Sequence, residues 1–244
     1  MKKSISLFSI LLVTIVLFSF QKTNPVSIWM VGDSTMAAKK AERYPESGWG
    51  VALADYVTGK AKVHNHAASG RSTLSFIAEG RWKKVCDSVQ KGDYVVIQFG
   101  HNDEKPDEKL HTEAFGTFKT NIKKFIDETR EKGAIPVVCS SIVRRHFDKF
   151  GKLVDTHGDY IKAAKEIAAE TKTIYIDMEG LTRKMVSEMG PDKSKEIYNF
   201  IGKRKDSTHL NVKGAKAVAA LFVKELKKEK LPLASLMKSE EDKK

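Results

Sequence analysis

Short apolar runs alternate with longer amphipathic segments along the chain from residue 26 onward. The apolar runs are rich in β-branched and aromatic residues, which favour strands. We expect strands at Val26–Val31, Lys62–His66, Tyr94–Phe99, Ile135–Ser140 and Thr173–Asp177. Apolar positions between these runs recur at helical spacing. They predict helices around Trp49–Val57, Phe76–Val89, Phe115–Lys132, Tyr160–Thr171 and Leu181–Met189.

A final helix is expected from about Asn211 to Lys230. The apolar stripe that should face the sheet consists of Val212, Ala215, Val218, Ala219 and Phe222. Regular alternation of strands and helices is typical of a mostly parallel sheet that is covered on both faces. The sequence therefore predicts one α/β domain, a three-layer α/β/α sandwich around a mostly parallel five-stranded sheet. No internal repeat and no Gly/Ser linker divides it.

Three long loops remain in this pattern, at His101–Ala114, Val143–Asp159 and Gly190–Thr208. Long loops in a compact domain often carry function. The segment after Leu231 ends in SEEDKK, and we expect this charged tail to be frayed. The predicted domain therefore covers residues 25–230, and the tail covers residues 231–244.

The first 24 residues have the layout of an export signal. Lys2 and Lys3 precede the apolar stretch Ile5–Phe20, and polar residues follow it. No Ala-x-Ala cleavage site is present, and Ser19 is the best small residue near the end of the stretch. An uncleaved anchor is the alternative, although the stretch is short for a membrane span of ~20 residues. We expect a periplasmic or secreted protein that contacts a membrane only if this segment stays uncleaved.

The composition is that of a globular and basic chain. Its 244 residues include 43 Lys and Arg against 31 Asp and Glu, a formal charge of +12, and 41% are hydrophobic. This apolar share excludes collagen-like and wholly disordered chains, and two cysteines exclude a disulfide scaffold or a four-thiolate zinc site. Such a charge attracts polyanions, and for an exported protein an acidic polysaccharide is the most accessible. The alternative is that lysines are scattered over solvated helix faces. No nucleic-acid-binding signature occurs.

Three residues at two distant places suggest nucleophilic catalysis. Ser34 follows the first strand, at the sheet edge where open α/β folds bind ligands. Asp206 and His209 lie just before the last helix, and a carboxylate three residues from an imidazole can, on a loop, orient the ring as a base. Each residue alone could be only a helix cap. Together they supply a nucleophile, a base and an orienting carboxylate, although neither a Gly-x-Ser-x-Gly elbow nor a Walker phosphate loop is present.

Two further strand ends carry candidate donors for an oxyanion. Gly70 lies in the loop after the second strand, and Asn102 follows the third. The backbone N–H groups of Ser34 and Gly70 and the Asn102 amide can converge above the sheet. Taken singly, Gly70 could be a turn residue and Asn102 a loop cap.

These segments resemble the four conserved blocks of the SGNH (GDSL-type) hydrolases. The resemblance covers about residues 26 to 225, and the amino-acid sequences of the blocks are similar to those of the rhamnogalacturonan acetylesterase branch. The matching segments are GDSTM at Gly32–Met36, AASGRS at Ala67–Ser72, FGHND at Phe99–Asp103 and DSTHLNVKGA at Asp206–Ala215.

The resemblance implies a flavodoxin-like fold and a serine esterase that removes acetyl groups from pectic rhamnogalacturonan, an acetylated acidic polysaccharide, without a metal or cofactor. It implies Ser34 as nucleophile, His209 as base and Asp206 as the residue that orients it. Ser34, Gly70 and Asn102 would form the oxyanion hole. We expect a monomer. The alternatives are another SGNH esterase, such as an acetylxylan esterase, a lipase or a thioesterase, or a carbohydrate-binding protein on a retired hydrolase fold.

Several histidines and arginines have two interpretations each. His101 is well placed beside Asn102 to touch substrate, and Arg71 and Arg144–His146 could pair with substrate carboxylates or be ordinary surface charge. His64 and His66 have a spacing that could bind zinc, but the absence of a third candidate ligand in the sequence favours a packing role.

The tryptophans and cysteines are expected to be structural. Trp49 and Trp82 could stack on sugars, but their place in amphipathic helices favours the core. Cys86 and Cys139 are most simply two inert thiols, although export would allow a disulfide.

Overall fold

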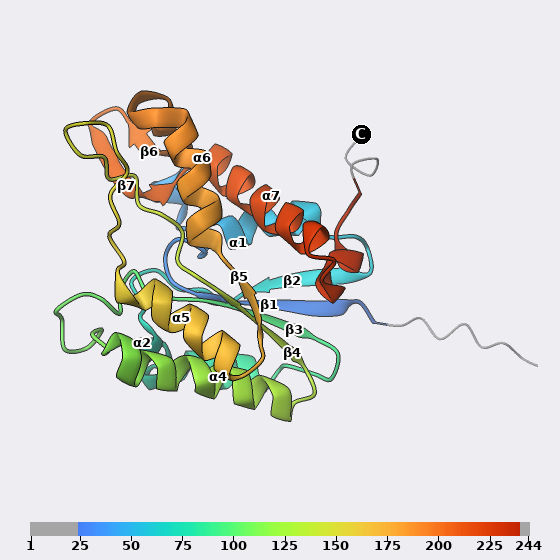
Figure 1. The fold of residues 1–244 in the computed structure, drawn as a ribbon. Helices are drawn as coiled ribbons and strands as arrows, with labels where there is room; N and C mark the ends of the chain where they lie inside the picture. The colour runs from blue at the N-terminus through green and yellow to red at the C-terminus, as the bar shows by residue number, and fades with distance from the viewer. Residues whose placement is uncertain (1–23, 240–244) are drawn as a thin grey trace, which may run out of the picture.

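A computed structural model describes residues 24–239, which form a three-layer α/β/α sandwich (Figure 1). Its central sheet has five parallel strands in the order β2-β1-β3-β4-β5. The strands are β1 Val26–Gly32, β2 Ala61–Asn65, β3 Tyr94–Gln98, β4 Ile135–Cys139 and β5 Ile174–Ile176. The predicted fold class and all five predicted strands are confirmed. The expected export signal lies outside the described residues.

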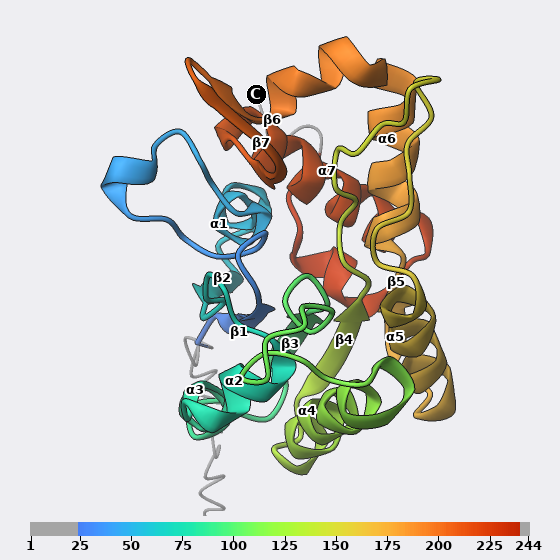
Figure 2. The ribbon, with the colours of Figure 1, turned by 90° about the vertical axis from the view of Figure 1, so that its left-hand side faces the viewer.

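Helices cover both faces of this sheet (Figures 1 and 2). The α-helices are α1 Trp49–Ala52, α2 Thr73–Ala78, α3 Arg81–Cys86, α4 Lys119–Glu131, α5 Asp159–Glu170, α6 Met178–Lys193 and α7 Val212–Lys228. Short 3-10 segments occur at Ala41–Arg43, Leu53–Tyr56, Ser194–Ile197 and Pro232–Leu236, and a π-helical turn at Ala114–Phe118 precedes α4. Within residues 24–239, none of the helices combines the length and the apolar character that crossing a membrane requires.

The alternation of side chains along the strands builds two separate cores. In β1, Ile28 and Met30 join a core with α1, α6 and α7, whereas Trp29 and Val31 join the opposite core with α2 to α5. Successive side chains of a strand point to opposite faces, so a strand buried on both sides is apolar throughout. This explains why the central strands β1, β3 and β4 are largely apolar runs, whereas the edge strand β2 contains polar residues.

Glycines break the helical conformation at two places. The helix expected over Phe76–Val89 is divided into α2 and α3 at Gly80, whose φ is +68°. Gly190, at φ +71°, interrupts the regular conformation of α6 just after the predicted end at Met189. Glycine adopts this left-handed conformation without the steric penalty of other residues, so both breaks lie where the chain changes direction.

A two-stranded hairpin replaces most of the loop predicted at Gly190–Thr208. Its antiparallel strands are β6 Tyr198–Ile201 and β7 Arg204–Leu210, and Gly202 at φ +56° begins the turn. The loop prediction was wrong here because β7 is mostly polar and half-exposed, so no apolar alternation marks it. Asp206 is consequently held on a strand and not on a loop.

The chain after α7 also differs from the expected charged tail. Leu233 is fully buried, and Met237 pairs with Val57 through an antiparallel bridge. The packed part of the molecule therefore extends beyond residue 230, because the apolar residues of this segment cover the end of the α7 core.

Candidate active site

Ser34 lies in the tight turn that follows β1. The backbone N–H of Ala37 donates to the carbonyl of Asp33, which folds the chain back directly after the strand. Gly32 is required by close packing here, since a Cβ at this position would lie 2.6 Å from the Gln98 carbonyl. Ser34 itself is 7% exposed. The turn thus presents the serine at the carboxyl edge of the sheet, as the sequence predicts.

A buried series of hydrogen-bonded side chains supports this turn. The Asp33 carboxylate accepts hydrogen bonds from the Thr35 backbone N–H (2.9 Å) and hydroxyl (2.8 Å). Gln98 donates to that hydroxyl (2.7 Å) and accepts from the Trp49 indole (2.8 Å). Burial raises the pKa of Asp33 despite the two bonds from Thr35. These hydrogen bonds connect the Ser34 turn to β3 and α1, which restricts the movement of the turn.

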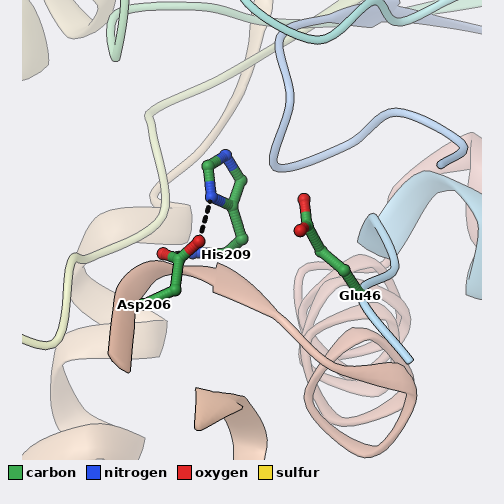
Figure 3. A group of neighbouring side chains, drawn as sticks. All are labelled: Glu46, Asp206 and His209. Carbon is green, nitrogen blue, oxygen red and sulfur yellow. Dashed lines mark hydrogen bonds and ion pairs between the residues drawn. The ribbon is translucent and has the colours of Figure 1, made fainter. Parts of the chain in front are cut away.

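Asp206 and His209 are brought to Ser34 by β7. The His209 Nδ1 lies 2.8 Å from Asp206 Oδ2 (Figure 3). The His209 Nε2 lies 2.9 Å from Ser34 Oγ. The other carboxylate oxygen of Asp206 accepts from the backbone N–H groups of Thr208 and His209, each at 2.9 Å.

These bonds define the protonation state of the pair. Burial acts to raise the pKa of Asp206, but hydrogen bonds from His209 and Thr208 outweigh it and hold the pKa well below the usual value. An ionised carboxylate only accepts hydrogen bonds, so Nδ1 of His209 carries the proton. Its Nε2 is then free to accept from the Ser34 hydroxyl, which is the arrangement of a general base.

The two other candidate donors border the same cavity as Ser34 and His209, which has a volume of about 570 Å³. Gly70 has φ +77°, and a Cβ there would meet open space, so its backbone conformation and not crowding favours glycine. The Asn102 amide donates to the Arg71 carbonyl (3.0 Å), and its oxygen accepts from Lys105 (2.7 Å). One amide hydrogen of Asn102 remains for a ligand.

A buried ion pair beside Ser34 was not predicted. The Lys39 Nζ donates to the Ser34 carbonyl (2.6 Å) and the Ser69 hydroxyl (3.2 Å), and it lies 3.0 Å from Glu46 Oε1. The side chains of Lys39 and Glu46 are only 6% and 3% exposed. Burial acts to raise the pKa of Glu46, but Lys39 and Arg43 together lower it. No spacing in this lysine-rich segment distinguishes Lys39 from its neighbours, so only the tertiary contacts reveal it.

Glu46, Asp206 and His209 form the one group among the described residues whose donor atoms lie close enough for a shared metal ion (Figure 3). These donor atoms lie within 4.8 Å of one another. However, Glu46 already pairs with the cations of Lys39 and Arg43, and Asp206 with His209. The local charge therefore suits a neutral or anionic ligand better than a metal cation.

His101 lies mainly behind the site. It is 2% exposed, and its Nδ1 is 3.1 Å from Nε2 of His157. It borders a smaller cavity of about 220 Å³ next to Ser34. Burial lowers the pKa of His101 well below its usual value and that of His157 to about 3, so both rings stay neutral. Little of the His101 surface is available to a substrate.

Each of the candidate arginines has partners within the fold. Arg144 is ion-paired with Glu104, and Arg145 donates to the Ser194 hydroxyl (3.0 Å). Both guanidinium groups thus hold the loop between β4 and α5 in place. Arg71 is ion-paired with Glu79 and borders the main cavity, and Arg144 borders the smaller cavity next to Ser34.

The remaining aromatic and cysteine side chains are structural, as predicted. His64 stacks on the Trp29 ring with centroids 4.5 Å apart, and His66 contacts the same ring. Trp49 and Trp82 are buried in the two cores. The two thiols, Cys86 and Cys139, are unpaired and belong to the cores on opposite faces of the sheet.

Several known proteins resemble this chain. A rhamnogalacturonan acetylesterase of Bacillus subtilis is 36% identical over 90% of this chain and 97% of its own length. A rhamnogalacturonan acetylesterase of Emericella nidulans is 31% identical over 81% of this chain and 83% of its own length.

Solved structures share the fold. A Bacillus subtilis protein superimposes with a TM-score of 0.77 at 27% identity, over 86% of this chain and 58% of its own. An acetylxylan esterase of Geobacillus stearothermophilus gives a TM-score of 0.61 at 20% identity, over 82% and 94% of the two chains. Residues 30–217 match the GDSL-like lipase/acylhydrolase family. A match of this extent, with relatives that are named esterases, shows that the chain belongs to this family and is a serine carboxylic ester hydrolase.

Proposed function

We propose that the protein removes acetyl groups from acetylated rhamnogalacturonan, an acidic pectic polysaccharide, with Ser34 as the nucleophile. The observation that carries this proposal is the continuous hydrogen-bonded line from Asp206 through His209 to Ser34, which opens into a cavity bordered by basic side chains. The two relatives named rhamnogalacturonan acetylesterases support the choice of substrate.

Acylation begins at Ser34 Oγ. The oxygen attacks the acetyl carbonyl carbon while His209 Nε2, 2.9 Å away, takes its proton. The developing oxyanion accepts hydrogen bonds from the N–H groups of Ser34 and Gly70 and from the Asn102 amide. The imidazolium then gives its proton to the sugar oxygen, which leaves as an alcohol and leaves an acetyl group on Ser34.

Deacylation repeats these steps with water. His209 takes a proton from the water molecule as its oxygen attacks the acetyl-enzyme, and the proton returns to Ser34 Oγ when acetate leaves. Asp206 remains ionised throughout, because its hydrogen bonds hold its pKa low. Its negative charge stabilises the imidazolium in both steps.

Export of the chain is part of the proposal. The charged, apolar and then polar order of the first 24 residues supports a signal segment. An exported enzyme would act on a polysaccharide outside the cytoplasm.

The test is acetate release from acetylated rhamnogalacturonan, acetylated xylan and a short-chain aryl acetate. We expect the wild type to prefer rhamnogalacturonan and Ser34→Ala to lose activity on all three by ~10³-fold or more. Ser88→Ala, an exposed serine on the opposite side of the sheet from α7, is the matched control and should retain activity.

Two results would change this interpretation. Activity that depends on Ser34 but favours xylan would preserve the mechanism and replace the substrate. Activity that survives Ser34→Ala would contradict the mechanism itself.

A further inference from the structure

The cavity at Ser34 is strongly basic. Its cationic lining residues are Lys39, Lys40, Arg43, Arg71, Arg81 and Lys105. Glu46 is the acidic residue of this lining, and it already pairs with Lys39 and Arg43. The two other arginines of the lining, Arg71 and Arg81, lie in the Gly70 loop and at the start of α3.

One carboxylate holds two of these arginines side by side. Glu79, between α2 and α3, accepts from Nε of Arg71 (3.1 Å to each oxygen) and from Nε of Arg81 (2.6 Å). Both bonds use the inner nitrogen of the guanidinium. Arg71 directs Nη1 to the Ser69 carbonyl (2.8 Å), while its Nη2 and both terminal nitrogens of Arg81 have no partner among residues 24–239.

We propose that Arg71 and Arg81 form a subsite for a carboxylate of the substrate, in the chemical class of a uronic acid residue. A guanidinium binds a carboxylate best through two parallel N–H donors. Glu79 orients the pair while the unpaired terminal nitrogens remain available at the cavity. Two guanidinium groups and one carboxylate also leave a net positive charge for an anionic ligand.

The same loop connects this subsite to the reacting ester. The Arg71 carbonyl accepts the hydrogen bond that orients the Asn102 amide, and the Arg71 side chain bonds back to Ser69, next to Gly70. A carboxylate bound here would lie beside the proposed oxyanion donors. The subsite therefore favours an acetyl group on the uronic acid itself or on the adjoining sugar, and this assignment rests on the esterase function proposed above.

Arg81→Gln tests the subsite on two substrates that differ only in charge: acetylated rhamnogalacturonan and the same polymer with its carboxyl groups reduced to alcohols. Arg81 is partly exposed, so the substitution should fold normally. We expect kcat/KM to fall ~10-fold or more on the acidic polymer and less than ~2-fold on the reduced polymer, since a charge-assisted pair is lost only with the former.

Lys83→Gln is the matched control on the same helix. It also removes one positive charge and one ion pair, with Asp87, but it does not border the cavity. We expect it to leave the ratio between the two polymers unchanged.

The possible outcomes distinguish a failure of the proposed subsite from a failure of the proposed action on acetylated rhamnogalacturonan. Equal losses on both polymers with Arg81→Gln, or an equal change with Lys83→Gln, would overturn the subsite while the esterase function stands. Failure of the wild type to release acetate from either polymer would instead overturn the proposed action on rhamnogalacturonan.

Discussion

At the scale of single residues, the buried carboxylate of Asp103 supports the proposed oxyanion donor. It follows Asn102 and accepts hydrogen bonds from the Thr73 backbone N–H (3.0 Å) and the Thr112 hydroxyl (3.0 Å). Its second oxygen has no partner among the described residues. Burial raises the pKa of Asp103 to about 7, although the bonds from Thr73 and Thr112 act against this shift. The loop that carries Asn102 is therefore tied to α2 by a group that titrates near neutral pH.

Asp103→Asn should change how stability depends on pH. Between pH 4 and 7 the unfolded chain releases the proton that folded Asp103 retains, so this residue makes the wild type less stable as pH rises through that interval. Asparagine keeps the accepting oxygen and removes the titration. We therefore compare the free energies of unfolding of the two proteins. Relative to the wild type, that of the variant should rise by on the order of 3 kcal/mol between pH 4 and pH 8.

Urea unfolding at several pH values measures this difference. A difference that stays constant over the whole range would show that Asp103 does not titrate in this interval.

At the scale of elements, the segment between β1 and α1 joins the Ser34 turn to the hairpin that carries Asp206 and His209. Figure 2 shows this segment projecting beside β6 and β7. The Glu46 carboxylate accepts a hydrogen bond from the Asn199 amide on β6 (3.1 Å), and the Glu46 backbone forms a bridge with Asn211. The same carboxylate pairs with Lys39, which donates to the Ser34 carbonyl. The Lys39–Glu46 pair thus connects residues more than 150 positions apart.

Breaking this pair should weaken the fold and the site together. Glu46→Gln leaves the Lys39 ammonium buried without a counter-charge, which typically costs about 3 kcal/mol or more of stability. Lys39→Met alone should also destabilise, because it leaves the Glu46 carboxylate with fewer partners. The double variant should lose at least 1 kcal/mol less than the sum of the two single losses, as expected for a contacting pair.

Urea unfolding of the four proteins completes this double-mutant cycle. Losses that add within ~0.5 kcal/mol would mean that the two side chains contribute independently.

At the scale of the whole molecule, stability depends on two cores and on the segment that closes one of them. Leu233 is buried in the core shared by α1, α6 and α7, and the Thr58 N–H donates to the Leu236 carbonyl (2.9 Å). Met237 adds a backbone bridge to Val57. The last packed segment thus joins the start of β2 to the end of α7, far from the active site.

Leu233→Ala should therefore lower the free energy of unfolding by about 2–5 kcal/mol, because it removes a fully buried side chain and leaves a cavity. Thermal unfolding and kcat on an aryl acetate measure the two properties separately, and kcat below the transition should change little. Ser235→Ala, exposed on the same short helix, should shift stability by less than ~0.5 kcal/mol. Equal stability of the two variants would indicate a frayed tail.

The sequence by itself determined the sheet and the candidates for catalysis. Strands buried on both faces are continuous apolar runs, and such runs are visible without a structure. Ser34, Asp206 and His209 were candidates from their residue types and their positions near a strand end and a helix start, and the resemblance to a known family implied their roles. The sequence did not predict the hairpin that carries Asp206, since β7 is polar and forms by pairing with β6.

Only the tertiary structure decided which charged side chains matter. Lys39 is one of many lysines in the sequence, and its role depends on burial against Glu46 and Ser34. Arg71 and Arg81 share one carboxylate, Glu79, at the border of the main cavity, whereas Arg144 is held by Glu104. The physical reason is that apolar patterns reflect local periodicity, whereas the role of a charge depends on partners and burial that distant segments supply.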